Sequence, residues 1–350
     1  MKKKDVRSMK LTMQLKSRSY DIILKAGCLA NLHQFTNVQG RKVFVLTDSG
    51  VPTDYAKIVA GQCQDSTVYT IPQGEGSKCL KVYGQVLQAM LEFGMDRKDL
   101  LVAVGGGVVG DLGGFCAASY MRGIDFVNCP TTVLSQVDSS IGGKTAVDLG
   151  DTKNIVGAFW QPKLVIVDPD TLATLPRRHY INGLAEAVKA SLLADPELFA
   201  IFEKGDIDGQ INEIIYRSLR FKKNIVEQDE TEHGMRKALN FGHTIGHGIE
   251  AVKGIKGRRT VGLFHGECVA LGMLPMIESK ALQKRVRAVY RRLGLPLRTT
   301  YNKEKVLAEM LHDKKAQGGQ ITIIKVPGLG CWRAETIPVE GLRPLLGMEE

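Results

Sequence analysis

A strand-like run that leads straight into a glycine loop is the feature that most constrains the fold of this chain. The apolar residues Leu100–Val104 are followed by Gly105-Gly-Gly-Val-Val-Gly110-Asp111. Glycines at 105, 107 and 110 fit the pattern GxGxxG, in which the backbone approaches a pyrophosphate at a helix N-terminus. The pattern predicts a dinucleotide site, and a tight structural turn is the alternative. The fingerprint is incomplete, because Asp125, about 20 positions on, precedes a strand instead of ending one.

Strand-like and helical segments alternate in the first half of the chain. Apolar, β-branched runs occur at 42–47, 67–71, 100–104, 126–129 and 164–167. Helical stretches such as Leu80–Phe93 separate several of them, which is typical of a parallel α/β sheet. After Pro176 long amphipathic segments follow, at 183–203, 210–228, 239–252, 267–293 and 303–315. We therefore expect an α/β, Rossmann-like domain over residues 1–176 and a mainly α-helical domain over residues 177–350.

Three of the seven histidines lie in one short region of the sequence. His243 and His247 are four residues apart and share a face if the segment is helical, and His265 follows in the motif HGE. Imidazole is a preferred zinc ligand, and catalytic zinc sites have three protein ligands and one open position. Thr244 stands where the glutamate of the protease motif HExxH would be, which argues against a protease. Glu186 would complete a Glu/His/His set, and a solvated helix charge is the alternative for this residue.

The chain is strongly basic, with a formal net charge of +10. The basic residues are dispersed and follow no nucleic-acid recognition motif, so an anionic small substrate is the better functional interpretation. A generally basic surface is the alternative. Lys222 is the most informative cation, because it falls on the apolar stripe of segment 210–228, where a lysine is costly unless it is paired, functional or snorkelling. Other candidates for binding phosphate and carboxylate groups are Arg122, Lys144, Lys153, Lys189, Arg236 and Lys314.

The sequence also indicates a compartment. The basic N-terminus is not followed by the apolar core of a signal peptide, because residues 11–23 alternate apolar and polar side chains as a half-buried strand would. No apolar run reaches the roughly 18 residues that would span a membrane. The seven cysteines are scattered and show no CxxC spacing, which argues for a reducing environment. We expect a cytoplasmic protein.

Several segments, taken together and in order, resemble the 3-dehydroquinate synthase family. The motifs run from about Tyr69 to Lys315 and are GGGVVGD, RGIDF, PTT, QVDSSIGGKTAVD, KNIVGAFWQP, NGLAEAVK, LNFGHTIGH and HGE. The resemblance implies an NAD-binding N-terminal domain, a helical metal-binding domain and a homodimer. It implies a Zn²⁺ or Co²⁺ ion held by Glu186, His243 and His265, with His247 in proton transfer and substrate contact instead of metal binding.

The resemblance also assigns the remaining site residues. Catalytic roles fall on His247, Lys144, Glu232, Asn240, Lys189 and Lys222. Substrate contacts fall on Arg122, Asp138, Lys144, Asn154, Lys189, Lys222, Arg236, Asn240, His247 and either Lys314 or Lys315. NAD contacts fall on Asp48, Gln73, Gly74, Glu75, Gly76, Ser77, Lys78, Gly106, Gly107, Val108, Val109, Gly110, Asp111, Thr131, Thr132, Asp138, Lys144, Lys153, Thr171, Leu172, Ala173 and Thr174. Judged from its residues alone, the 73–78 loop offers a carboxylate for ribose and an amine for phosphate, or is simply a helix N-terminus.

The activity that the resemblance implies is a redox-neutral elimination of phosphate by a carbon-oxygen lyase of the shikimate route to chorismate and the aromatic amino acids. The substrate would be 3-deoxy-D-arabino-heptulosonate 7-phosphate, whose phosphate and carboxylate account for the many cations. NAD oxidises the C5 hydroxyl, phosphate leaves, the hydride returns, the ring opens, and an intramolecular aldol step gives 3-dehydroquinate.

Three alternatives stay open. One is another sugar-phosphate cyclase, such as a 2-epi-5-epi-valiolone or 2-deoxy-scyllo-inosose synthase, and another is a metal-dependent alcohol or glycerol dehydrogenase. The third is a regulator that binds NAD or zinc without catalysis. The identities of Asn240, His247 and the Lys314-Lys315 pair favour the dehydroquinate synthase family over the other cyclases.

Overall fold

The computed structural model describes residues 8–16, 18–150, 152–252, 262–312, 316–317 and 319–348. The chain divides into two compact units, Met1–Tyr180 and Ile181–Glu350. The predicted division, after residue 176, falls about one helical turn earlier, at the start of helix α4 (Arg177–Ala194). Each unit has its own β-sheet and its own helices.

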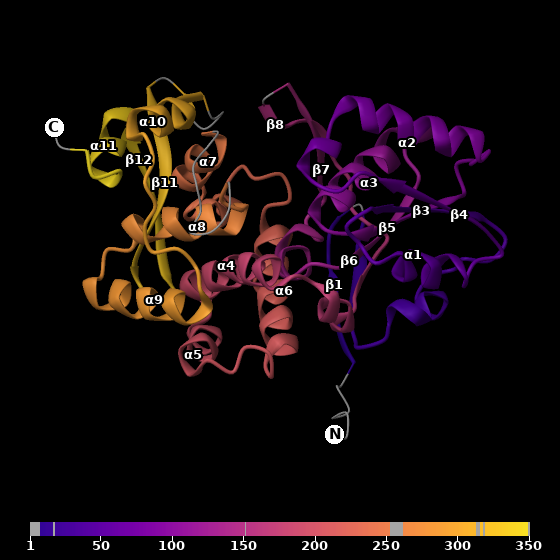
Figure 1. The fold of residues 1–350 in the computed structure, drawn as a ribbon, viewed down its shortest axis with the longest axis horizontal. Coiled ribbons are helices and arrows are strands. Elements are labelled where there is room, and N and C mark those ends of the chain that lie inside the picture. The colour runs from indigo at the N-terminus through magenta and orange to yellow at the C-terminus, as the bar shows by residue number, and fades with distance from the viewer. Residues whose placement is uncertain are drawn as a thin grey trace. The chain divides into compact units, whose positions relative to one another are not determined.

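A seven-stranded sheet forms the centre of the first unit (Figure 1). Its order is β1-β2-β9-β6-β5-β3-β4, and the described strands are parallel except for β1, which is antiparallel to β2. Their bounds are β1 (Met9–Met13), β2 (Tyr20–Leu24), β3 (Lys42–Asp48), β4 (Asp65–Ile71), β5 (Leu100–Gly105), β6 (Asp125–Pro130) and β9 (Leu164–Val167). The five predicted strand runs are confirmed as β3, β4, β5, β6 and β9. The alternating run at 11–23 forms two paired strands instead of one.

Alternate residues of a strand point to opposite sides of the sheet, and in the central strands both sets are apolar. Helices therefore cover both faces of this sheet. Val45 and Val102 point into one core, which α1 (Thr53–Ala60) and the 3₁₀ helix η1 (Leu29–Gln34) close. Leu46 and Ala103 point into the other core, which α2 (Leu80–Glu92) and α3 (Gly107–Ser119) close. Figure 1 shows α2 and α3 on one side of the sheet and α1 on the other. The near-continuous apolar strands of the sequence follow from this double burial.

Short elements follow the carboxyl ends of the strands, which is where ligands bind in open α/β sheets. The helical turns η2 (Glu75–Ser77), η4 (Ser135–Ser139) and η5 (Pro169–Thr174) come after β4, β6 and β9, while η3 (Tyr120–Arg122) leads into β6. A separate hairpin pairs β7 (Lys144–Leu149) with β8 (Thr152–Phe159). The buried carboxylate of Asp168 fastens the end of β9 by accepting N–H bonds from Gly27 (2.9 Å), Leu29 (3.0 Å) and Asp170 (3.1 Å).

The second unit is mainly helical, as predicted. Its helices are α4, α5 (Pro196–Lys204), α6 (Ile211–Gln228), η6 (Met235–Asn240), α7 (His243–Ala251), α8 (His265–Met273), η7 (Leu274–Met276), α9 (Lys280–Leu293), α10 (Lys303–His312), η8 (Val339–Gly341) and α11 (Leu342–Leu345). The helix predicted at 183–203 is broken at Pro196, and the one predicted at 267–293 is broken near Pro275, because proline has no N–H to continue the helix.

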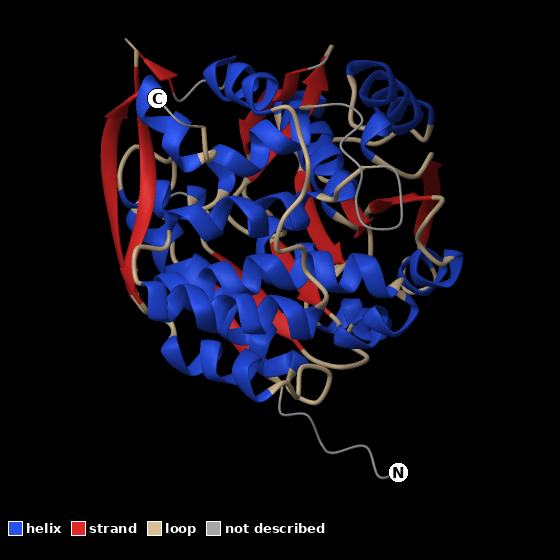
Figure 2. Ribbon diagram, turned by 60° about the vertical axis from the view of Figure 1, so that its left-hand side comes forward, coloured by secondary structure: helices blue, strands red, loops and turns tan. Residues whose placement is uncertain are grey.

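The second unit also contains a small sheet that the sequence analysis did not predict. Strand β11 (Gln320–Gly328) pairs antiparallel with β10 (Ala316–Gln317) and β12 (Cys331–Pro338). Figure 2 shows it as long red arrows near the C-terminus, beside the blue helices. The fold class is therefore α/β followed by a mainly helical unit, with this sheet added.

The helices and the cysteines of the structure bear on the expected absence of membrane spans and of disulfides. Among the described residues, no helix combines the length and the apolar character that crossing a membrane requires. All seven cysteines lie in the described part of the chain, and each is a free thiol.

Candidate functional site

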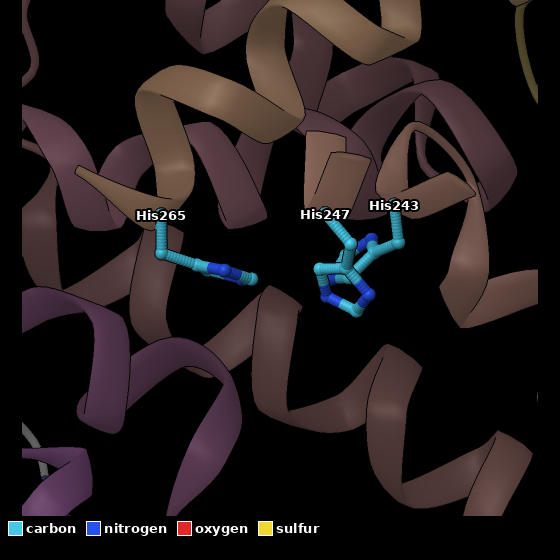
Figure 3. Close-up of side chains that lie close together, drawn as sticks. All are labelled: His243, His247 and His265. Atoms are coloured by element: carbon cyan, nitrogen blue, oxygen red, sulfur yellow. The ribbon is translucent and has the colours of Figure 1, made fainter. Parts of the chain in front are cut away.

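Two neighbouring helices of the second unit bring the three clustered histidines together (Figure 3). His243 and His247 project from α7, and His265 is the first residue of α8. One ring nitrogen from each lies within 4.8 Å of the others. Figure 3 shows the His265 ring directed from its own helix toward the other two rings. The predicted shared face of His243 and His247 is confirmed, and the cluster has the spacing of a metal site.

Glu186 of α4 supplies a carboxylate to the same cluster. Its Oε1 lies 3.5 Å from Nε2 of His243 and 3.5 Å from Nε2 of His265. Ligand atoms at the corners of a tetrahedron with zinc bond lengths of ~2.0–2.1 Å are about 3.3–3.4 Å apart. The side chain is almost completely buried, at 1% exposure, so it is not a solvated helix charge. One carboxylate and two imidazoles at these separations fit a divalent ion such as zinc or cobalt.

Charge in the cluster is balanced by a buried lysine. The ammonium of Lys189, one turn along α4, forms an ion pair with Glu186 and donates to the Leu239 carbonyl at 3.0 Å. Burial alone would raise the pKa of Glu186, but Lys189 and His265 outweigh burial and lower that pKa to about 2. Burial alone would lower the pKa of His265, but the carboxylates of Glu186 and Glu250 raise it to about 10. A metal ion bound here at neutral pH therefore displaces a proton.

Glycines allow the ligand-bearing helices to approach closely. A Cβ on Gly272 of α8 would lie 2.0 Å from the Gly242 carbonyl oxygen at the start of α7, and one on Gly246 of α7 would lie 3.1 Å from the Cys268 carbonyl oxygen. A Cβ on Gly266 would lie 2.0 Å from the Asn182 carbonyl oxygen of α4. Only glycine permits backbone contact of this kind. The three helices that carry Glu186, His243 and His265 are thus packed backbone against backbone.

Each residue of the motif HGE has its own contact at the start of α8. His265 faces the cluster, and Gly266 allows α4 to approach while its N–H donates to Asn182 Oδ1 at 2.7 Å. The carboxylate of Glu267 accepts the Phe264 N–H at 2.9 Å and so satisfies a free donor at the start of α8. The motif therefore combines a ligand, a packing residue and a helix cap.

A second polar group lies between α6 and η6. Asn240 Nδ2 donates to Glu232 Oε1 at 2.9 Å, and Glu232 has a left-handed backbone with φ of 66°. The Asp229 carboxylate holds this turn by accepting the N–H groups of His233, Gly234 and Arg236 at 2.7–2.9 Å. Lys222 lies on the buried face of α6, at 9% exposure, as its place on the apolar stripe predicted.

The first unit holds the predicted nucleotide residues. β5 runs into Gly105, and α3 begins at Gly107, so the predicted strand, glycine loop and helix are confirmed. Asp48 ends β3, the neighbour of β5, and is buried, and burial raises the pKa of its carboxyl. A carboxylate therefore does end a strand beside the glycine loop, although it precedes the loop in sequence. Asp125 instead begins β6 at the opposite end of its strand and pairs with Arg41 at 3.4 Å.

Lys78 links three of the predicted segments within this unit. Its buried ammonium contacts Asp111 Oδ2 of α3 and Asn154 Oδ1 of β8, both at 2.5 Å. Asn154 has a left-handed backbone, with φ of 53°. Burial alone would lower the pKa of Lys78, but Asp111 and Glu75 raise it, so the ammonium stays charged. The 73–78 loop is thus held to α3 and to the β7–β8 hairpin by side chains.

The other predicted residues that the structure describes lie in the first unit. Arg122 follows Met121 in a turn where both have positive φ, Thr131 and Thr132 follow β6, Asp138 lies in η4, Lys144 begins β7, Lys153 lies in β8, and Thr171–Thr174 lie in η5. Lys314 and Lys315 lie outside the described residues. The basic, glycine-containing sequence of segment Val252–Gly262 predicts a loop that leaves His265 within reach, and residues 253–261 of this segment also lie outside the described residues.

Sequence reasoning missed three side chains that support the cluster. Glu250 contacts His265, Asn182 contacts Gly266, and Asp229 holds the turn with Glu232. Glu250 had one usable signal, because it lies seven residues after His243 and therefore on the same helix face. The other two depend on tertiary contacts that carry no periodic pattern.

The sequence matches known proteins over nearly its whole length. Two family models, described as 3-dehydroquinate synthase N-terminal and C-terminal, match residues 68–182 and 183–316. A 3-dehydroquinate synthase from Streptococcus mutans serotype c is 40% identical over 360 residues, which covers 97% of this chain and 99% of the relative. The chain belongs to the 3-dehydroquinate synthase family. Another member, from Enterococcus faecalis, is 38% identical with the same coverage. The predicted family is confirmed.

Solved structures show the same fold. A 2-deoxy-scyllo-inosose synthase, solved with carbaglucose-6-phosphate, NAD⁺ and Co²⁺, has a TM-score of 0.87 at 22% identity and covers 97% of this chain and 99% of its own. A 2-epi-5-epi-valiolone synthase from Streptomyces hygroscopicus subsp. jinggangensis, solved with NAD⁺ and Zn²⁺, has a TM-score of 0.82 at 27% identity, with coverages of 95% and 98%. A glycerol dehydrogenase from Schizosaccharomyces pombe has a TM-score of 0.61 at 16% identity, with coverages of 93% and 87%. The predicted fold class is confirmed.

Proposed function

We propose that this chain converts 3-deoxy-D-arabino-heptulosonate 7-phosphate into 3-dehydroquinate and phosphate, with NAD and a divalent metal ion as cofactors. The observation that carries the proposal is the position of Glu186 Oε1, 3.5 Å from Nε2 of both His243 and His265, in a chain about 40% identical to 3-dehydroquinate synthases. Residues 1–176 would bind NAD, and residues 177–350 would bind metal and substrate.

Different residues of the chain would bind the metal, bind NAD and transfer protons. Glu186, His243 and His265 would hold the metal, and the 73–78 loop and the first turn of α3, as far as Asp111, would hold NAD. When bound, NAD would take up and return a hydride, and the metal ion would polarise the substrate oxygen as a Lewis acid. His247, in the cluster but outside this ligand set, would exchange protons through its ring.

Cations would bind the two anionic groups of the substrate. Lys189, Lys222 and Arg236 are buried or nearly so, and charge-assisted hydrogen bonds are strongest where water is excluded. Arg122, Asp138, Lys144 and Asn154 of the first unit, with Lys314 or Lys315, complete the proposed substrate set. Glu232, fixed by its contact with Asn240, would act as a further acid or base.

We also propose a homodimer in the cytoplasm, a proposal that rests on the family resemblance together with the free thiols.

Release of phosphate without net redox change tests the proposed reaction. The purified chain, with NAD and Zn²⁺, is expected to release phosphate from 3-deoxy-D-arabino-heptulosonate 7-phosphate. NADH should not accumulate, so absorbance at the NADH wavelength should show no lasting rise. A chelator is expected to stop the release, because the Glu186 cluster would lose its ion. Lasting NADH absorbance would indicate a dehydrogenase instead. Phosphate release only from another sugar phosphate would indicate another cyclase.

Replacing Lys222 by alanine is expected to weaken substrate binding and leave NAD binding intact. Losing a charge-assisted hydrogen bond costs about 1.5–3 kcal/mol, so kcat/KM should fall about 10- to 100-fold. Lys223→Ala is the matched control, because its ammonium pairs with Glu227 at 2.7 Å on the same helix. Steady-state kinetics and NAD titration measure both effects. Equal kinetics for the two variants would contradict a substrate role for Lys222.

A further inference from the structure

The ring of His265 is engaged at both of its nitrogens. Nε2 lies 3.5 Å from Glu186 Oε1, inside the cluster, and Nδ1 lies 3.0 Å from Glu250 Oε2, on the other side of the ring. His243 has the same arrangement, because its Nδ1 lies 3.2 Å from the Phe241 carbonyl oxygen while its Nε2 faces Glu186. Both imidazoles therefore turn Nε2 inward and have an oxygen acceptor behind Nδ1.

An acceptor behind Nδ1 determines which form of the imidazole is available. When Nδ1–H donates to an oxygen, the neutral ring leaves the lone pair of Nε2 free for a metal ion. His265 needs such support more than His243 does. Its side chain is 29% exposed, against 12% for His243, and it starts its helix, so fewer neighbours restrict the ring.

Glu250 reaches His265 from the neighbouring helix. It lies on the α7 face that carries His243 and His247, at i+7 from the first and i+3 from the second. One helix would thus provide a ligand, a proton-transfer residue and the carboxylate that holds a ligand of another helix. The contact also ties α7 to the first turn of α8.

We propose that Glu250 is a positioning residue of the metal site, which accepts the Nδ1–H of His265 and holds Nε2 toward the ion. The proposal rests on the metal ligands given under the proposed function. It goes beyond them by assigning a role to a side chain outside the proposed metal and substrate sets. It predicts that Glu250 influences metal affinity and metal geometry through its contact with His265.

The test measures metal binding directly. Glu250→Ala and Glu250→Gln are made in the full chain, stripped of metal, and titrated with Zn²⁺ against a chromophoric chelator. Loss of such an outer partner typically weakens metal affinity about 10- to 100-fold, which is expected for Glu250→Ala. Glu250→Gln should lose less, because an amide oxygen can still accept the Nδ1–H. The Co²⁺ absorption bands of Glu250→Ala should also shift, because the His265 ring is no longer fixed.

A control variant separates positioning from general destabilisation. The Glu227 side chain is 20% exposed, similar to Glu250 at 16%, and pairs with Lys223 at 2.7 Å. Glu227→Gln should keep the wild-type Zn²⁺ affinity and Co²⁺ spectrum.

Three outcomes would overturn the proposal. Wild-type Zn²⁺ affinity and Co²⁺ spectrum in both Glu250 variants would show that Glu250 does not position the ligand. An equal loss in Glu227→Gln would show a general effect on the fold. A wild-type chain that binds no metal would overturn the proposed ligand set together with this inference, whereas failure of the Glu250 variants alone leaves the ligand set standing.

Discussion

Replacing Glu186 by glutamine is expected to abolish metal binding and activity together, whereas replacing His247 by alanine should leave the metal in place. The cluster offers two possible ligand sets, the three histidines or Glu186 with His243 and His265. In the second set the buried carboxylate pairs with Lys189 through Oε2, while Oε1 is directed at both ring nitrogens, so a metal ion would have a negatively charged ligand atom between the two rings. We therefore expect Glu186, and not His247, to be the third ligand.

The expected magnitudes separate the two variants clearly. A metal that acts as a Lewis acid contributes several kcal/mol to transition-state stabilisation, so activity of Glu186→Gln should fall about 10³-fold or more. Loss of a proton-transfer residue costs about 10²- to 10⁴-fold, so His247→Ala should also be slow while holding one metal ion per chain. His243→Ala is the positive control, because His243 belongs to both ligand sets.

The measurement is metal content per chain after gel filtration, together with NAD binding as a check that the first unit is intact. Glu186→Gln with a full complement of metal, or His247→Ala without metal, would establish the three-histidine set instead. Full activity of His243→Ala with stoichiometric zinc would rule out both sets.

Much of the first unit was predictable because its strands are buried on both faces. Such strands appear in the sequence as short apolar runs, and the run at 100–104 leads into glycines that side chains approach closely, since an added Cβ would lie 2.6 Å from Val109 at Gly105 and 3.1 Å from Thr132 at Gly106. The acidic residue beside the loop was harder to find from spacing. Asp48 ends a strand that precedes the glycine loop in sequence, and adjacency in the sheet, not along the chain, places it there.

The second unit shows where periodicity is insufficient. Asp195 and Pro196 mark the break between α4 and α5, since Asp195 caps the new helix by accepting the Leu198 N–H at 2.9 Å. A long amphipathic pattern continues through this break and hides it. The strand β11 was missed because it follows a series of long amphipathic helical segments, and its β-branched residues were not recognised as a separate strand signal.

Part of the histidine cluster was predictable from helical periodicity. The spacing of His243 and His247 fixed one face of a helix, so their proximity followed from local geometry. Glu186 lies in a distant segment, and only the family resemblance connected it to them. Glu250 looks like any helix glutamate in sequence, because its contact depends on how closely α7 and α8 pack.

Because α7 and α8 pack so closely, replacing Gly272 by alanine is expected to destabilise the protein strongly. A methyl group at this position would lie 2.0 Å from the Gly242 carbonyl oxygen and 2.8 Å from the Gly246 nitrogen, the two atoms of a hydrogen bond in the first turn of α7. Neither backbone atom can rotate away, so α7 and α8 must separate. Alanine favours a helix over glycine by about 1 kcal/mol, but overpacking costs about 1–3 kcal/mol and occasionally more, and a contact with backbone that cannot move aside belongs at the upper end. Destabilisation should therefore win.

Because His243 directly follows Gly242 and His265 begins α8, separating the helices should also weaken Zn²⁺ binding in Gly272→Ala. Gly84→Ala is the opposite control, since Gly84 lies in the exposed face of α2 with no atom within 4 Å of an added methyl group. That variant should be stabilised by up to about 1 kcal/mol. Urea unfolding of the metal-free proteins shows whether each variant has a higher or a lower free energy of unfolding than the wild type, and Zn²⁺ titration gives the metal affinity. If Gly272→Ala were as stable as the wild type and bound Zn²⁺ equally well, the metal site would not depend on backbone contact between α7 and α8.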